Sequence, residues 1–243
     1  MKLSIVGFWG AYPEANGATS GYLLQNKNTN VLIDCGSSVV SKLQNIIALK
    51  DLDAVILSHY HADHMADIHC LQYATLIDMQ LGKRKNPLPI YALVDETHFE
   101  SLNFQECTEA IPIREESSVS IGSFHFNFIK TVHPDPCFAI RATENDNSVT
   151  YTADTGWFDD LIDFARYSDL LLCEASLYNE NFGMIEGHLT AGEAGKLANM
   201  AEVENLILTH LPHFGDINRL IVEAKAEFNG RVEIASEFKT VEL

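Results

Sequence analysis

The stretch Ser58-His59-Tyr60-His61-Ala62-Asp63-His64 decides how this chain folds. It places three imidazoles and one carboxylate close together, directly after the apolar run Ala54-Val55-Ile56-Leu57. Such a run predicts a buried strand, and ligands of α/β sheets gather where strands end. Side chains two apart in an extended segment point the same way, so His59 and His61 can bind one ion, and the following turn can aim Asp63 and His64 at a second. Because zinc and similar divalent metals prefer imidazole and carboxylate, the stretch predicts a metal site.

The charge of the chain excludes some partners. The formal charge is −18, from 16 basic and 34 acidic residues among 243. An acidic surface repels long polyanions, so long nucleic acid is disfavoured as a substrate. The one basic cluster, Lys83-Arg84-Lys85, is short and predicts a solvated loop. A small anion stays compatible, because bound metal cations reverse the local field.

The cysteines and the N-terminus bear on the compartment. Five scattered cysteines without a CxxC pair argue against a disulfide framework and predict a reducing, cytoplasmic location. We expect all five to be small core residues. Residues 1–6 predict a strand rather than a signal peptide, since no small-residue cleavage site follows. No apolar run is long enough to cross a bilayer, so no membrane partner is expected.

The first part of the chain predicts mainly strands. Strands are expected at residues 2–8, 21–25, 31–35, 89–93, 110–113, 119–132, 137–143 and 148–153. Helical spacing of apolar residues predicts helices over 39–47, from 65 to about 80, and over 95–106.

The second part alternates strands and helices. Strands are expected at residues 169–173, 205–208 and 231–235, and helices at 158–166, 190–203 and 216–230. Thr190 and Glu193 form a capping-box signature, and Asp216 and Gly230 bound the last helix. With no linker and no repeat in the sequence, we expect a single domain over 1–243. Its class is α/β (α+β), with sheets packed on each other and helices outside.

Candidate ligands recur at the predicted strand ends. Asp34, His133, Asp154 and His210 each follow a predicted strand, as the 59–64 cluster does. Together they supply enough ligands for two metals if one carboxylate bridges them. Two ions roughly 3.5–4 Å apart can hold a hydroxide and polarise a substrate oxygen.

The order of these residues resembles the five motifs of the metallo-β-lactamase fold superfamily, over residues 34 to 210. The resemblance implies a four-layer αβ/βα sandwich with a dinuclear site, usually of zinc, with manganese as the alternative. It assigns one ion to His59, His61 and His133, the other to Asp63, His64 and His210, and the bridging position to Asp154. Asp34 would lie behind the ligands and orient a histidine.

Departures from the family pattern narrow the subfamily. Classical zinc β-lactamases carry a cysteine where this chain has Asp154, which disfavours an antibiotic substrate. Flavodiiron proteins carry a glutamate where this chain has His61, which disfavours oxygen reduction. The segment Gly187-His188-Leu189-Thr190-Ala191 resembles one of the ribonuclease Z-like group. In that group this histidine contacts the phosphate and assists the leaving group.

Ribonuclease Z proteins insert a long basic-tipped arm between the third histidine motif and the bridging aspartate. Here a predicted hairpin fills the short segment from His133 to Asp154, and Leu211-Pro212-His213-Phe214 departs from that family's pattern. A small anionic phosphodiester or nucleotide is therefore the predicted substrate of a metal-dependent phosphodiesterase.

The resulting hypothesis has a bridging hydroxide, held by Asp63 and both metals, attack phosphorus. His188 stabilises the developing charge and protonates the alkoxide, and Glu174 could orient it. The alternatives are a carbonyl hydrolase (lactonase or thioesterase) on the same metals, ribonuclease Z-like processing of transfer RNA, and a metal-stapled binding module.

Other features carry weaker expectations. Members of the ribonuclease Z-like group often form homodimers, but the sequence identifies no interface. His213 is close enough to His210 to line the same pocket. The remaining histidines are expected to be ordinary: His69, His98 and His125.

Overall fold

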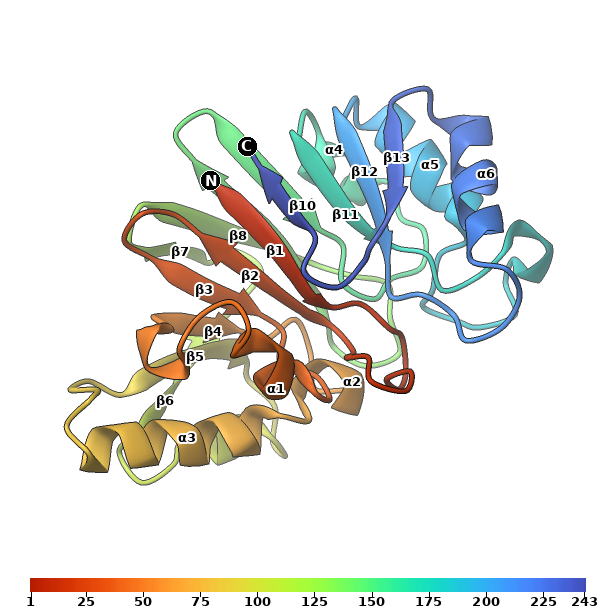
Figure 1. Cartoon of the computed structure of the whole chain (residues 1–243). Helices are drawn as coiled ribbons and strands as arrows, with labels where there is room; N and C mark the ends of the chain where they lie inside the picture. Colours follow the sequence, from red (N-terminus) through yellow and green to blue (C-terminus); the bar gives the residue numbers. More distant parts are fainter. The chain divides into compact units, whose positions relative to one another are not determined.

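The computed structural model describes all residues, 1–243. They divide into two compact units, a first unit of residues 1–114 and 237–242 and a second unit of residues 115–236 with Leu243. Each unit is built on one seven-stranded mixed sheet (Figure 1). The prediction of a single domain over 1–243 stays a prediction.

The sheet of the first unit has the order β14-β1-β2-β3-β4-β5-β6. Its strands are β1 (Lys2–Gly7), β2 (Gly21–Gln25), β3 (Asn30–Ile33), β4 (Ala54–Ile56), β5 (Leu88–Leu93), β6 (Thr108–Ile113) and β14 (Thr240–Glu242). The predicted hairpin of β2 and β3 is confirmed, and strands β3 to β6 are parallel. The ends of β3 and β4 therefore lie at one edge of this sheet.

Two helices cover one face of the first sheet. The unit contains α1 (Val39–Leu43), α2 (Ala62–Met65) and α3 (Ile68–Gln80), with short 3-10 turns η1 (Leu49–Asp51) and η2 (Phe99–Leu102). Helices α1 and α3 share one buried cluster with strand residues of the sheet, which include Leu23, Leu32, Val55 and Ile90. Burial of this apolar face is the main stabilising contribution to the unit.

The helix predicted over 95–106 is wrong. Only η2 is helical there, because Gln105 and Glu106 have φ values of +45° and +59°, which a right-handed helix cannot contain. Asp95 Oδ1 accepts from the backbone N–H groups of His98 and Phe99, as at a helix start, so the helical conformation begins but does not continue past Leu102. The helix predicted over 39–47 is also shorter than expected, since α1 ends at Leu43.

The sheet of the second unit has the order β13-β12-β11-β10-β9-β8-β7. Its strands are β7 (Ser118–Ile121), β8 (Phe124–Lys130), β9 (Phe138–Glu144), β10 (Asn147–Tyr151), β11 (Leu170–Glu174), β12 (Asn205–Thr209) and β13 (Arg231–Ile234). Strands β7 to β10 are antiparallel, and β10 to β13 are parallel. Because β8 and β10 both run against β9, strands β8, β10, β11 and β12 all end at one edge.

The strand predicted over 119–132 is two strands. Gly122 has a φ of +59° and turns the chain between β7 and β8. This left-handed backbone conformation is open to glycine at no steric cost, so the apolar alternation on either side belongs to a hairpin. The predicted hairpin of β9 and β10 is confirmed.

Helices α5 and α6 lie along the parallel half of the second sheet (Figure 1). The unit contains α4 (Asp160–Ala165), α5 (Ala191–Met200), α6 (Asn218–Glu227) and the 3-10 turn η3 (Asn179–Asn181). The predicted capping box is confirmed, since Thr190 accepts from the Glu193 N–H and Glu193 accepts from the Thr190 N–H. Asp216 Oδ1 accepts from the Asn218 N–H at the start of α6.

No helix of this chain combines the length and apolar character that a membrane crossing requires. All five cysteines are free thiols. Four are buried as predicted, and Cys70 is exposed, so the expectation of a core position is wrong for that residue.

Replacing Thr190 with valine is expected to destabilise the protein by about 1 kcal/mol, because the cap of α5 is lost while the β-branched shape is kept. The urea midpoint of unfolding measures this change. Thr190→Ser keeps the hydroxyl and should stay nearer to the wild type than Thr190→Val does. Equal losses in both variants would contradict the capping role.

Candidate metal centre

The predicted site residues lie at the sheet edges that the parallel strands define. In the first unit Asp34 follows β3, and residues 59–64 follow β4. In the second unit the predicted residues follow β8, β10 and β12, in the order His133, Asp154 and His210. Each unit therefore collects its own half of the predicted residues at one edge.

The carboxylate of Asp34 organises the histidines of the first unit. Asp34 is fully buried. Its Oδ1 accepts from the Ser58 N–H at 2.8 Å, and its Oδ2 accepts from the Ser58 hydroxyl at 2.9 Å and from His64 Nδ1 at 2.8 Å. The Ser58 oxygen lies 3.0 Å from His59 Nδ1. One carboxylate thus contacts His64 directly and reaches His59 through a hydroxyl.

These contacts fix which ring nitrogen carries the proton. A carboxylate only accepts, so His64 Nδ1 is the donor. The single Ser58 proton goes to Asp34, so His59 Nδ1 must donate to the Ser58 oxygen. Both imidazoles therefore present a lone pair on Nε2, the form that binds a metal.

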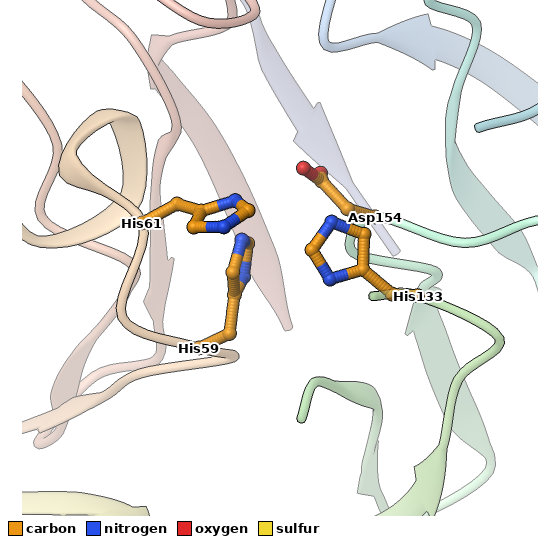
Figure 2. Close-up of side chains that lie close together, drawn as sticks. All are labelled: His59, His61, His133 and Asp154. Carbon is orange, nitrogen blue, oxygen red and sulfur yellow. The ribbon is translucent and has the colours of Figure 1, made fainter. Parts of the chain in front are cut away.

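Asp63 and His61 complete the first half. Asp63 Oδ2 accepts from the Ala11 N–H at 2.7 Å and lies 3.5 Å from His64 Nε2. The ligand nitrogens of His59 and His61 lie within 4.8 Å of each other, and their rings meet edge to face (Figure 2). Each of these two pairs, Asp63 with His64 and His59 with His61, therefore has the spacing of two side chains that bind one ion.

A glycine allows the close approach behind this half. The Gly36 N–H donates to the Ser20 carbonyl, and the Cys35 N–H donates to the His64 carbonyl at 2.8 Å. A Cβ on Gly36 would overlap the Asp63 carbonyl oxygen and the Thr19 hydroxyl. The loop after β3 can therefore hold the 63–64 backbone only with glycine at this position.

Tyr60, between the two histidines, faces away from them. Its hydroxyl donates to the Leu93 carbonyl at the end of β5, at 2.5 Å. Burial, and then the charge of Asp95, raise the pKa of this phenol well above its usual range. The hydroxyl is thus an anchor for the loop and stays protonated.

Three histidines have ordinary partners outside the cluster. His69 Nδ1 contacts Gln72 at 3.0 Å, His98 Nδ1 contacts Asp95 at 2.6 Å, and His125 Nδ1 contacts Ser120 at 2.8 Å. These contacts agree with the expectation that none of the three belongs to the site.

In the second unit, His133 and Asp154 lie on loops that are tied together (Figure 2). The Thr131 hydroxyl donates to the Asp154 carbonyl at 2.8 Å, and the Gly156 N–H donates to the Val132 carbonyl at 2.7 Å. His133 Nδ1 lies 2.9 Å from the Asp135 carbonyl oxygen. That carbonyl can only accept, so Nε2 of His133 also carries the lone pair.

His210 is held by a network that resembles the one around Asp34. His210 Nδ1 lies 2.7 Å from the Ser176 hydroxyl, which donates to Glu174 Oε2 at 2.6 Å. Glu174 is fully buried at the end of β11, and its Oε1 accepts from the Thr155 N–H at 2.8 Å. His210 Nε2 lies 3.4 Å from Asp154 Oδ2. Asp154 and His210 therefore form the third pair with ligand spacing.

His188 shares the Glu174 carboxylate. Its Nδ1 lies 3.1 Å from Oε1 and 3.2 Å from Oε2, which supplies the orienting contact that the sequence left open. Its ring stacks on His210 at 5.4 Å between centroids and meets His133 edge to face at 5.8 Å. Gly187, with a φ of +81°, brings this loop close, since a Cβ there would lie 3.0 Å from His133 Cδ2.

The backbone at the strand ends is strained. Asp34, His210 and Ala153, the residue before Asp154, have φ values of +57°, +51° and +50°. The left-handed region is uncommon for residues other than glycine, and such residues cluster at functional sites. Three separate turns therefore carry strain where the predicted ligands leave the sheets.

The two cysteines beside the carboxylates are fully buried core residues. Burial, followed by the charges of Asp67 and Asp34, raises the pKa of the Cys35 thiol well above its ordinary value. Burial, followed by the charge of Glu174, does the same for the pKa of Cys173. A raised pKa favours the neutral thiol, the form in which a buried cysteine packs as a small apolar side chain.

The sequence reasoning gave no role to Ser58 and Ser176. Both touch a carboxylate and a histidine in the structure. A signal was present for Ser176, since it lies two residues after Glu174 in an extended segment, where side chains share a side.

Comparisons with known proteins identify the family. A model of the β-lactamase superfamily domain matches residues 29–211. The chain belongs to the β-lactamase superfamily. It is 44% identical over 236 residues to a protein named "Probable metallo-hydrolase YhfI" from Bacillus subtilis, with 97% of each chain covered. The crystal structure of YhfI, described as a metallo-β-lactamase fold protein, superposes with a TM-score of 0.98 at 42% identity, over 100% of this chain and 99% of that one. The predicted fold class is confirmed.

More distant members of the superfamily are also similar. Ribonuclease Z of Archaeoglobus fulgidus is 24% identical over 306 residues, covering 100% of this chain and 98% of its own length. A structure described as a new diphosphatase from the PhnP family has a TM-score of 0.80 at 16% identity, over 100% of this chain and 96% of that one, and shows the fold alone. The family implies divalent metal ions, and the histidine and aspartate clusters of the chain agree with that implication.

Replacing Gly36 with alanine is expected to destabilise the first unit by about 1–3 kcal/mol, because the added methyl group overlaps the Asp63 backbone. Thermal and urea unfolding measure the loss. Gly156→Ala is the matched control, since a Cβ there would have its nearest neighbour at 3.6 Å. Similar stability of the two variants would contradict the close approach described above.

Proposed function

We propose that this protein is a metal-dependent phosphodiesterase that acts on small phosphodiesters or nucleotides at a dinuclear site. The observation that supports the proposal is a hydrogen-bonding pattern shared by four histidines: His59, His64, His133 and His210. Each of these imidazoles has its Nδ1 against an oxygen that accepts, so each presents Nε2 as a ligand. With His61, Asp63 and Asp154 they make seven candidate ligands, more than the four that a structural site uses.

The donor set fits two ions. We assign His59, His61 and His133 to one ion, Asp63, His64 and His210 to the other, and Asp154 to both. Nitrogen and carboxylate oxygen suit zinc, with manganese as the alternative. The pairs with ligand spacing inside each unit support the assignment, as does the family membership.

Two divalent ions, when bound, supply positive charge for the phosphoryl oxygens and a nucleophilic water at neutral pH. The side chains add orientation. Asp63, held by the Ala11 N–H, would be a ligand whose carboxylate orients the water that the ions supply. Asp34 keeps the rings of His64 and His59 from rotating, which would keep their Nε2 atoms available to an ion.

His188 is the proton donor to the leaving group. Its Nδ1 donates to the buried Glu174 carboxylate, which fixes the orientation of the imidazole ring. An alkoxide is a poor leaving group, so a proton donor lowers the barrier of its departure. His188 follows Gly187 just before the capped start of α5, where the helix dipole favours an anion.

Substrate size follows from charge and from the segment before Asp154. The chain carries a formal charge of −18, which opposes binding of a long polyanion. The hairpin of β9 and β10 occupies the segment between His133 and Asp154, where ribonuclease Z proteins insert their arm. A small phosphodiester avoids both obstacles. A distant relative by sequence bears the name "Ribonuclease Z", which supports a phosphodiester as the substrate class.

The purified protein is expected to hydrolyse bis(p-nitrophenyl) phosphate, to lose this activity on chelation, and to regain it with Zn²⁺ or Mn²⁺. The same assay applied to lactones, thioesters and precursor transfer RNA separates the rival substrates. Faster turnover of a lactone or thioester than of any phosphodiester would replace the proposal by a carbonyl hydrolase.

Chelation also tests the metal-stapled binding module. Each unit has a buried apolar core of its own, so circular dichroism and the urea midpoint should show a folded chain without metal. Unfolding on chelation would instead indicate that the ions are structural.

Replacing His188 with alanine is expected to slow hydrolysis of alkyl phosphodiesters by about 10²-fold or more, because the leaving alkoxide loses its proton donor. Nitrophenyl esters should be affected far less, since their leaving group is a weak base. His125→Ala, which replaces an exposed histidine of the same unit, is the control and should leave both rates unchanged. Equal losses on both ester types would remove the role of His188 as an acid.

A further inference from the structure

The Ser176 hydroxyl contacts three groups of the second unit. It lies 2.6 Å from Glu174 Oε2, 2.7 Å from His210 Nδ1 and 3.3 Å from His188 Nδ1. It also lies 3.2 Å from the His210 carbonyl oxygen. One small side chain therefore touches the carboxylate and both histidines that the carboxylate serves.

The protons in this network can be placed by counting. Ser176 has one hydroxyl proton, and its shortest contact is with Glu174, a carboxylate that also accepts from the Thr155 N–H and faces His188 Nδ1. If that proton pointed at His210 instead, two oxygens would face each other at 2.6 Å with no hydrogen between them. The proton therefore lies on the Glu174 side, and His210 Nδ1 must donate its own.

The backbone of His210 adds a second reason for a fixed contact. Its φ of +51° is a strained conformation, and the adjacent Ala175 N–H holds the Thr209 carbonyl at 2.9 Å. A strained residue persists only where its surroundings determine it fully. Ser176 contacts this residue at both its ring and its carbonyl.

We infer that Ser176 is the positioning residue of His210: it fixes the tautomer that presents Nε2 and couples this ligand to the Glu174–His188 pair. The inference rests on the proposed function for the identity of His210 as a ligand. Its consequence is that the metal ligand and the proton donor share one buried carboxylate. A change in the hydrogen bonding of His210 or of His188 then alters that of the other histidine through the Ser176 hydroxyl.

The first unit supports the inference independently. There Ser58 donates to Asp34 and accepts from His59, while His64 contacts the same carboxylate directly. The elements are the same: a fully buried carboxylate, one serine and two histidines, one reached directly and one through the hydroxyl. Two unrelated stretches of sequence thus form the same hydrogen-bonding arrangement, which favours a role for the serine hydroxyl over chance packing.

The primary test is the tautomer of His210 in the metal-free protein, measured by long-range ¹H–¹⁵N NMR above the ordinary pKa of histidine. Wild-type protein is expected to carry the proton on Nδ1. Ser176→Ala should lose this preference, and Ser176→Thr, which keeps the hydroxyl, should restore it. A wild-type His210 protonated on Nε2 would overturn the inference without any variant.

The second readout is metal binding by calorimetric titration with Zn²⁺. Ser176→Ala should weaken one of two equivalents by about 10- to 100-fold and leave the other unchanged. Ser168→Ala removes another buried hydroxyl of the same unit, which donates to the Ala165 carbonyl, and should change neither readout. An unchanged tautomer and unchanged binding in Ser176→Ala, or the same effects in Ser168→Ala, would overturn the inference.

The tautomer needs no substrate, so the result separates the two proposals. If the wild type cleaves no phosphodiester but His210 shows the expected tautomers, only the proposed function fails. If the wild type is an active phosphodiesterase and Ser176→Ala keeps tautomer, binding and turnover, only the role of Ser176 fails.

Discussion

A buried carboxylate that needs donors is the constraint on which the candidate site depends. An isolated buried charge is so costly that it persists only when hydrogen bonds surround it. Asp34 and Glu174 each meet this demand with one backbone N–H, one serine hydroxyl and one imidazole. The hydrogen bonds to these two carboxylates also fix the orientation and the tautomer of the neighbouring imidazole rings. The fold itself therefore orients these imidazoles, and the entropy lost in ordering them is offset during folding.

The sheets place these carboxylates where they can act. In the first sheet the parallel strands β3 and β4 end at a common edge. In the second sheet the parallel strands β10, β11 and β12 do the same. Left-handed residues at Asp34 and His210 then turn the backbone at once, so the side chains stay beside the strand ends. The apolar interior of each sheet thus serves as a rigid support for polar loops.

Much of this could be predicted from the sequence, and the failures have physical causes. Alternating apolar residues located most strands, and the 59–64 cluster pointed to histidine and aspartate side chains that the structure brings together at a sheet edge. The helix expected over 95–106 failed because Gln105 and Glu106 take left-handed backbone conformations that a right-handed helix cannot contain. Ser58 could not be found, and Ser176 offered only its position two residues after Glu174, since a serine becomes specific mainly through partners that are distant in the sequence. The short strand β14 carries too few residues for any periodicity.

That last strand has a consequence for biosynthesis. Strand β14 pairs with β1 antiparallel, with Leu3 opposite Val241, so residues 237–242 close the sheet that the first 114 residues begin. A ribosome makes residues 115–236, which hold all the strands of the second sheet, before it makes this closing strand. The nascent first sheet must wait with β1 as an open edge, while the second sheet, made of consecutive residues, can pair as soon as it emerges. We therefore expect the later half of the chain to finish folding first, and a nascent chain stalled before residue 237 to be prone to edge-to-edge association.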